Sequence, residues 1–211
     1  PPRRLHHRRA HPAGGRGGRF SASLTRRGRP LRSATDLMTP LYLLATTSPN
    51  LFGEDEADAF MGPRGGTIDL AKFLKNHRQV DRGRLGIVGF CMGGRLVYLM
   101  SAASRDLKAG VMFYGGSTMV PFGDGPSPFD RTREISCPIQ GHFGAEDKNP
   151  SPEDMRKLDA ELTRWGKAHE FHTYAGAAHA FANAGSNNYR PHAAALSWPK
   201  ATEFFSKHLV G

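Results

Sequence analysis

From about residue 84 onward, apolar and polar positions alternate in blocks that have the lengths of strands and helices. Short apolar runs bounded by glycine, proline or polar residues predict buried strands. These runs fall at 84–90, 109–114, 138–144 and 169–174. Apolar residues recurring at helical spacing predict helices, at 92–103, 152–165 and about 191–208. Strands alternating with helices of this length favour right-handed crossovers, so the pattern predicts an α/β fold with a mainly parallel sheet flanked by helices.

The stretches outside these blocks are less regular. Acidic and glycine-rich residues over 51–66 predict a loop, and Thr67 is suited to cap a helix through about residue 77. The proline-containing stretch 115–133 predicts a long loop that could form the rim or lid of a site. The apolar run Leu41–Ala45 is compatible with either a strand or a helix turn.

The excess of basic over acidic residues is confined to the start of the chain. Residues 1–35 hold ten arginines, no lysine and no acidic residue, whereas the rest of the chain carries 19 basic and 19 acidic residues. The formal net charge of +10 therefore belongs to this tail. We expect residues 1–50 to form a basic, low-complexity and disordered segment, and residues 51–211 to form one folded domain.

The candidate chemistry begins where the first of the four predicted strands ends. Residues 89–93 read Gly-Phe-Cys-Met-Gly, a turn in which glycines flank a nucleophile, here Cys91. Glycine permits the tight turn, and the N-terminus of the following helix favours a thiolate and a developing oxyanion. The turn therefore predicts acyl transfer by Cys91, with the backbone N–H of Met92 as an oxyanion donor.

Two later residues follow predicted strands in the order expected for the partners of such a nucleophile. Asp147 comes after the strand at 138–144 and His179 after the strand at 169–174. His179 would exchange the proton and Asp147 would orient the imidazole. Taken singly, these residues are more often a turn residue and a surface histidine, and a lone cysteine is usually a small buried residue. Glu146 and Asp154 remain rivals of Asp147, because spacing does not exclude them.

The motifs together resemble the dienelactone hydrolase family of α/β-hydrolases. The similar stretches fall at 86–94, 113–116, 144–147, 176–181 and 189–205, and the resemblance covers about residues 67–208. It implies an α/β-hydrolase-like fold and a Cys-Asp-His triad, here Cys91, Asp147 and His179, that opens a small ester or lactone through a thioester. It implies no cofactor, and the sequence has no Cys/His cluster with the spacing of metal ligands.

The sequence departs from the family pattern at several points. Family members that take a carboxylated dienelactone have an arginine four residues after the histidine, where this chain has Asn183, and Ala178 replaces a glycine. The first strands of the family, with their glutamate and second oxyanion loop, are not recognisable before residue 67. We therefore expect the first strands to be missing or disrupted, and a catalytically impaired protein is the alternative function.

The arginine-rich tail admits three interpretations. It could be a nucleic-acid-binding arm, a transit peptide, or a shifted reading frame or misplaced gene start that replaces the first strands. We favour the third, because arginine without lysine suits a GC-rich gene read out of frame. The neutral body argues against nucleic-acid binding.

Other classes of protein find little support in the sequence. No run approaches the ~20 apolar residues of a membrane span, and no secretory signal or phosphate-binding loop is recognisable. Cys137 precedes a proline at a strand entry and is expected to be a core residue rather than a disulfide partner of Cys91. A reactive thiol suits a reducing compartment, so we expect a cytoplasmic protein. The oligomeric state stays open.

Overall fold

The structure is a computed structural model that describes residues 42–46 and 81–210, with side chains described from residue 81. The elements in chain order are β1 (Tyr42–Thr46), β2 (Leu85–Phe90), α3 (Met92–Ala103), β3 (Leu107–Phe113), the 3₁₀ helix η2 (Phe129–Glu134), β4 (Ile139–Gly144), α4 (Pro152–Arg164), β5 (His169–Tyr174), α5 (Pro191–Phe205) and the π-helical turn η3 (Ser206–Val210). The strands and helices predicted beyond residue 84 are therefore present at nearly the predicted positions.

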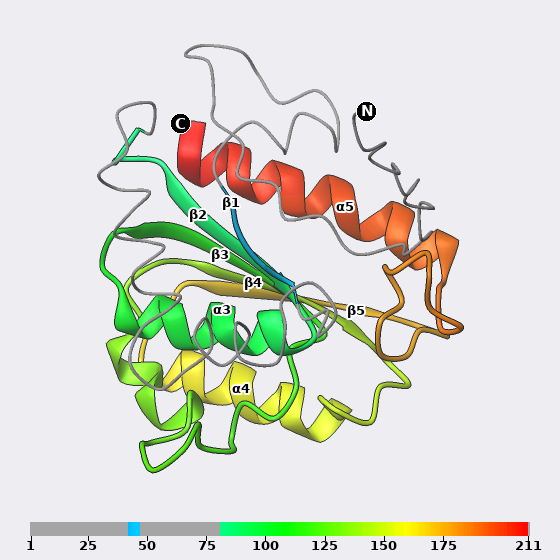
Figure 1. Cartoon of the computed structure of the whole chain (residues 1–211), viewed down its shortest axis with the longest axis horizontal. Coiled ribbons are helices and arrows are strands. Elements are labelled where there is room, and N and C mark those ends of the chain that lie inside the picture. The colour runs from blue at the N-terminus through cyan, green and yellow to red at the C-terminus, as the bar shows by residue number, and fades with distance from the viewer. Residues whose placement is uncertain (1–41, 47–80, 211) are drawn as a thin grey trace, which may run out of the picture.

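The five described strands form one sheet in the order β1-β2-β3-β4-β5, and every neighbouring pair is parallel. Helices α3 and α4 cover one face of the sheet and α5 covers the other (Figure 1). The predicted α/β fold with a mainly parallel sheet is confirmed. Because the strands are parallel, their carboxyl ends meet at one edge, where the loops that carry function in such sheets are found.

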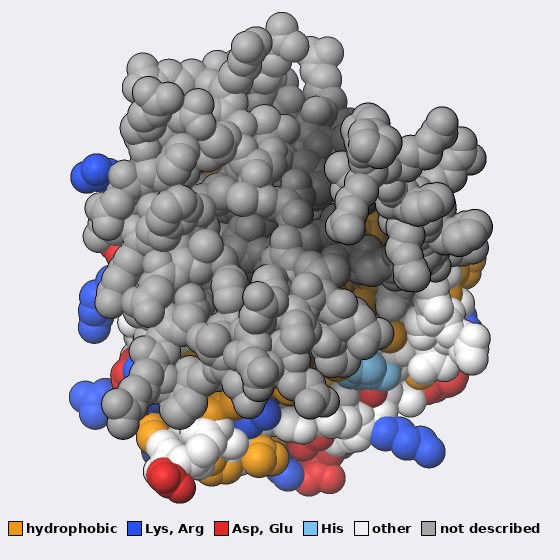
Figure 2. All heavy atoms as spheres, in the orientation of Figure 1, with side chains coloured by type: hydrophobic (Ala, Val, Ile, Leu, Met, Phe, Trp, Pro, Cys, Tyr) orange, Lys and Arg blue, Asp and Glu red, His pale blue; other side chains and the backbone are white. Residues whose placement is uncertain are grey.

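Alternate residues of each central strand belong to two separate cores. Ile87 and Met112 are fully buried in the core shared with α3 and α4, whereas Val88 and Phe113 pack in the core shared with α5. A strand covered on both faces is apolar throughout, which explains why the sequence shows continuous apolar runs rather than alternation. Among the coloured residues in Figure 2, basic and acidic side chains are interspersed.

The structure describes one strand before residue 67. The expectation that the first strands are missing or disrupted otherwise concerns residues outside the described part of the chain. β1 lies at Tyr42–Thr46 and pairs in parallel with β2, with Thr46 opposite Phe90. It occupies most of the run Leu41–Ala45, which the sequence left open between strand and helix turn. A short apolar run does not specify its own partner, so only its alignment along β2 decides its conformation.

Several other expectations fall outside the described residues. These are the loop at 51–66, the helix from residue 67 to about 77, and the N-terminal segment apart from β1. The proposed division into a basic segment and a folded domain stays a prediction.

One stretch differs from the sequence prediction, because the expected loop at 115–133 ends in η2. Helix α4 begins at Pro152, as predicted, behind a capping box at Ser151. The Ser151 Oγ accepts a hydrogen bond from the Asp154 N–H at 3.1 Å, while the Asp154 carboxylate accepts one from the Ser151 N–H at 2.9 Å. This reciprocal arrangement pairs N–H groups that would otherwise lack acceptors at the start of the helix.

Candidate active site

Cys91 lies in the turn between β2 and α3, and its backbone is strained. Its φ of 57° and ψ of −121° fall in a region that residues other than glycine rarely adopt. The Cys91 N–H donates to the Phe113 carbonyl at 3.0 Å, and the Cys91 carbonyl accepts from the Arg95 N–H at 3.2 Å. Bonds to β3 and to the first turn of α3 thus hold the thiol at the carboxyl end of the sheet.

The glycines around the nucleophile are required by close approach of the backbone. A Cβ atom at Gly89 would lie 2.1 Å from the carbonyl oxygen of Gly93, and one at Gly94 would lie 2.8 Å from the Cα of Gly115. The turn therefore brings β2 and α3 closer together than any side chain allows, as the sequence motif predicts.

Replacing Gly89 with alanine should therefore destabilise the fold. Because the new methyl group meets backbone rather than a flexible side chain, we expect a loss of about 3 kcal/mol in the free energy of unfolding. Urea titration followed by circular dichroism would measure it. Gly125→Ala is the matched control, since a Cβ there lies 3.9 Å from its nearest neighbour. Equal losses in the two variants would contradict this account of the turn.

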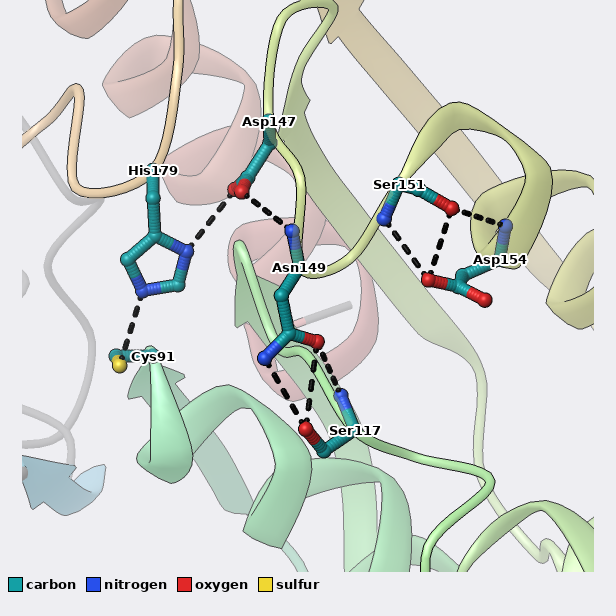
Figure 3. Close-up of polar contacts among 7 residues, drawn as sticks. All are labelled: Cys91, Ser117, Asp147, Asn149, Ser151, Asp154 and His179. Carbon is teal, nitrogen blue, oxygen red and sulfur yellow. Dashed lines mark hydrogen bonds and ion pairs between the residues drawn. The ribbon is translucent and has the colours of Figure 1, made fainter.

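The structure brings the three predicted side chains together from three different loops (Figure 3). The His179 Nε2 lies 3.0 Å from the Cys91 Sγ, and the His179 Nδ1 lies 3.0 Å from the Asp147 Oδ2. The Asp147 side chain is only 2% exposed, and that of His179 is 33% exposed. The histidine thus bridges a partly accessible thiol and a buried carboxylate, the order of contacts that a nucleophilic triad needs.

The two rival carboxylates are placed elsewhere. Asp154 caps α4, and Glu146 is exposed at the surface. The backbone N–H of Glu146 donates to the Ala177 carbonyl at 2.9 Å. This bond ties the turn after β4 to the loop that carries His179.

The surroundings of His179 favour its charged form. Its pKa is raised from 6.5 to about 10, first by the hydrogen bond to Asp147 and then by the contact with Cys91, while burial opposes both. At neutral pH the imidazolium donates from Nδ1 to the carboxylate and from Nε2 towards the sulfur. A charged donor beside a sulfur atom favours the thiolate.

This raised pKa predicts a specific dependence of stability on pH. A group whose pKa is higher in the folded state stabilises the fold fully below its unfolded value, here 6.5, and loses that contribution as pH rises to about 10. Between these values the wild type should lose more stability than His179→Gln, which has no group to titrate at this position. Urea unfolding of both proteins across this pH range would measure the difference. Parallel losses would contradict the assignment.

A fully buried histidine, His142, was missed by the sequence analysis. His142 in β4 is fully buried, with its Nδ1 2.8 Å from the Tyr174 hydroxyl and its Nε2 2.7 Å from the Gln140 Oε1. Burial lowers the pKa of His142 to about 3, so its ring is neutral. The amide nitrogen of Gln140 donates to Glu170 and to the Lys200 carbonyl, so its oxygen accepts from the Nε2–H of His142. His142 therefore joins β4 to β5, and Gln140 extends the contact to α5. A single polar residue in an apolar strand gives no sequence signal for that role.

Met92, the predicted oxyanion donor, is the first residue of α3. The N–H groups of a first helical turn have no acceptor within the helix, and α3 has no side-chain cap. The Met92 N–H thus has the position that the prediction requires, and its role stays a prediction. The second donor in this kind of site comes from a loop after a neighbouring strand. Residues 47–80, which follow β1, lie outside the described residues.

Other kinds of site find no support in the described part of the chain. Across residues 42–46 and 81–210, no three or more histidine, cysteine, aspartate or glutamate side chains are grouped so that they could hold a metal ion. In the same ranges no helix combines the length and apolar character needed to cross a membrane. Neither cysteine forms a disulfide, and burial raises the pKa of the Cys137 thiol. Cys137 is thus a buried core residue.

The site lies within a region similar to a known family. The dienelactone hydrolase family model matches residues 64–209. A Methylorubrum extorquens protein, provisionally named a carboxymethylenebutenolidase, is 30% identical over 143 residues, which cover 65% of this chain and 48% of that protein. A Bradyrhizobium protein, provisionally named a 2-oxo-3-(5-oxofuran-2-ylidene)propanoate lactonase, is 31% identical over 147 residues, which cover 68% of this chain and 59% of that protein.

A solved structure has the same fold. The crystal structure of a Klebsiella pneumoniae protein, provisionally described as a dienelactone hydrolase, superposes with a TM-score of 0.61 at 28% identity. The superposition covers 65% of this chain and 57% of that one. The chain spans between 48% and 59% of the length of the two curated relatives.

Proposed function

This chain belongs to the dienelactone hydrolase family, and we propose that it hydrolyses a small ester or lactone with Cys91 as nucleophile, His179 as acid and base, and Asp147 as orienter. One observation carries the proposal: the His179 ring lies 3.0 Å from the Cys91 Sγ on one side and 3.0 Å from the Asp147 Oδ2 on the other. The names of the relatives, which include a lactonase, support the substrate class.

The first half of the reaction is the formation of a thioester. The Cys91 thiolate attacks the carbonyl carbon of the ester, and negative charge develops on the carbonyl oxygen. The Met92 N–H and the positive end of α3 stabilise that charge. The His179 imidazolium, which faces the sulfur atom, gives its Nε2 proton to the leaving alkoxide, and the carbon–oxygen bond of the ester breaks.

The second half returns the enzyme to its starting state. The neutral His179 now takes a proton from a water molecule, which attacks the thioester and releases the acid. The Cys91 thiolate leaves, and His179 is again charged. Throughout, the buried Asp147 carboxylate accepts a hydrogen bond from the Nδ1–H of His179. This bond keeps the Nε2 nitrogen directed at the reacting atoms.

The substrate is expected to differ from a carboxylated dienelactone. Asn183 occupies the position at which the family members that take that substrate have an arginine, and an asparagine side chain carries no charge to pair with a carboxylate. We therefore expect a small ester or lactone that has no carboxylate to be paired at the position of Asn183.

Time-resolved mass spectrometry with a p-nitrophenyl ester tests the proposal. The wild type should gain the mass of one acyl group on a peptide containing Cys91, and the adduct should decay as free acid is released. Cys91→Ala should show no adduct. An adduct that forms but persists would favour the catalytically impaired alternative. A folded wild type that never acquires the adduct would overturn the proposal.

A further inference from the structure

Asn149 contacts the proposed orienting acid through its backbone. It lies two residues beyond Asp147, in the turn between β4 and α4, and its N–H donates to the Asp147 Oδ1 at 2.9 Å. The other carboxylate oxygen, Oδ2, faces His179 at 3.0 Å. Both oxygens of the carboxylate therefore have partners, and the direction of the acid depends on where the backbone of Asn149 is held.

The side chain of Asn149 holds that backbone against a second loop (Figure 3). Its Oδ1 accepts from the Ser117 N–H at 2.8 Å, and its Nδ2 donates to the Ser117 Oγ at 3.1 Å. Ser117 lies in the loop after β3 and has a positive φ of 53°. A Cβ at Gly116 would lie 2.4 Å from the Asn149 Oδ1, so the glycine makes room for this amide.

The loop after β3 in turn packs against the nucleophile turn. A Cβ at Gly115 would lie 2.6 Å from the carbonyl carbon of Gly94, in the first turn of α3. Contacts therefore run from Cys91 through His179 and Asp147 to Asn149. They return through Ser117 and its neighbouring glycines to the helix that begins at the nucleophile, which closes a ring around the site.

We propose that Asn149 is a positioning residue, whose amide clamps the turn of Asp147 to the loop after β3 and so sets the direction of the carboxylate towards His179. This role rests on the proposed function. Glu146, Lys148 and Asn149 are exposed, so burial does not fix the backbone of Asn149. The hydrogen bonds between its amide and Ser117 hold it instead.

Three variants separate positioning from stability. Asn149→Ala removes the whole amide clamp, whereas Ser117→Ala removes only the hydroxyl and keeps the backbone bond. Ser151→Ala is the matched control, because it weakens the cap of α4 two residues along the chain and touches neither Asp147 nor His179. Each full-length variant is compared by kcat and KM for a p-nitrophenyl ester, by urea unfolding, and by NMR titration of His179, assigned through its loss in His179→Gln.

The expected results differ between the variants. Asn149→Ala should lower kcat about 10- to 100-fold with little change in KM, as displacement of a reacting group does, and should weaken the proton affinity of His179 about tenfold. Ser117→Ala should lower kcat and the proton affinity of His179 as well, but by smaller factors. Ser151→Ala should lose stability while keeping kcat and the His179 titration.

Two results would overturn the proposal. One is an Asn149→Ala protein whose His179 titrates as in the wild type. The other is a Ser151→Ala protein with the same loss of kcat. If the wild type itself hydrolyses no ester, the proposed reaction fails, but the NMR titration still decides whether Asn149 controls the contact between Asp147 and His179.

Discussion

Cys91→Ala is expected to lower kcat for an activated ester by about 10⁴- to 10⁶-fold, the loss typical of removing the nucleophile of a triad. The methyl group of alanine cannot form the thioester, and the remaining groups stabilise only the direct attack of water. Stopped-flow absorbance with p-nitrophenyl acetate would measure the rate, and circular dichroism would verify that the variant is folded. The fold should be retained, because the thiol is partly exposed and its hydrogen bond to His179 is replaced by water.

Cys137→Ala provides the matched control for this experiment. Cys137 is the other cysteine of the chain and is buried in the core shared by α3 and α4. Its replacement should cost some stability and leave the rate almost unchanged. Full ester hydrolysis by pure Cys91→Ala would exclude Cys91 as the nucleophile, and a similar loss of rate in Cys137→Ala would trace the effect to the fold.

Asp147→Asn should have the second largest effect, a fall in kcat of about 10⁴-fold. An amide at this position removes the carboxylate whose hydrogen bond contributes most to the raised pKa of His179. The NH₂ group of the asparagine would also donate to Nδ1. The neutral imidazole would then carry its proton on Nε2, which could no longer accept a proton during the reaction. Steady-state kinetics would measure the fall, and NMR would show His179 titrating well below its wild-type pKa of about 10.

Asp154→Asn is the control for this substitution. Asp154 is a neighbouring carboxylate that follows the same strand, but it caps α4 and makes no contact with His179 among its described hydrogen bonds. It should lose about 1 kcal/mol of stability and keep its rate. If Asp154→Asn lowered kcat as much as Asp147→Asn, the assignment of the orienting acid would be wrong.

Much of the fold could be predicted from local patterns. Residues 84–90 show the length and apolar content of a buried strand, and the structure places β2 at Leu85–Phe90. The glycines that flank Cys91 also follow from local geometry, since a Cβ at Gly89 would meet the next turn of the chain. β1 was undecided for the opposite reason. Its run is short, and its conformation depends on pairing with β2, which is far along the chain.

The candidate site was predictable only in part, because it too depends on contacts between segments far apart in the chain. The order of Cys91, Asp147 and His179 is written in the chain, but three carboxylates were compatible with the role of the acid. The choice of Asp147 depends on the register between β4 and β5. This register brings the turn after β4, which carries Asp147, beside the loop after β5, which carries His179. The side-chain bonds of Asn149 to Ser117 span 32 positions and have no signal in local spacing.

By itself, then, the sequence determined the alternation of strands and helices, the tight turn at Cys91 and the order of the three reactive groups. These properties depend on side-chain periodicity and steric exclusion over a few neighbouring residues. Only the tertiary structure decided that residues 42–46 form a strand, that Asp147 is the carboxylate facing His179, and that His142 is buried and neutral. Each of these depends on contacts between segments far apart in the chain, because pairing, burial and charge are set where those segments meet.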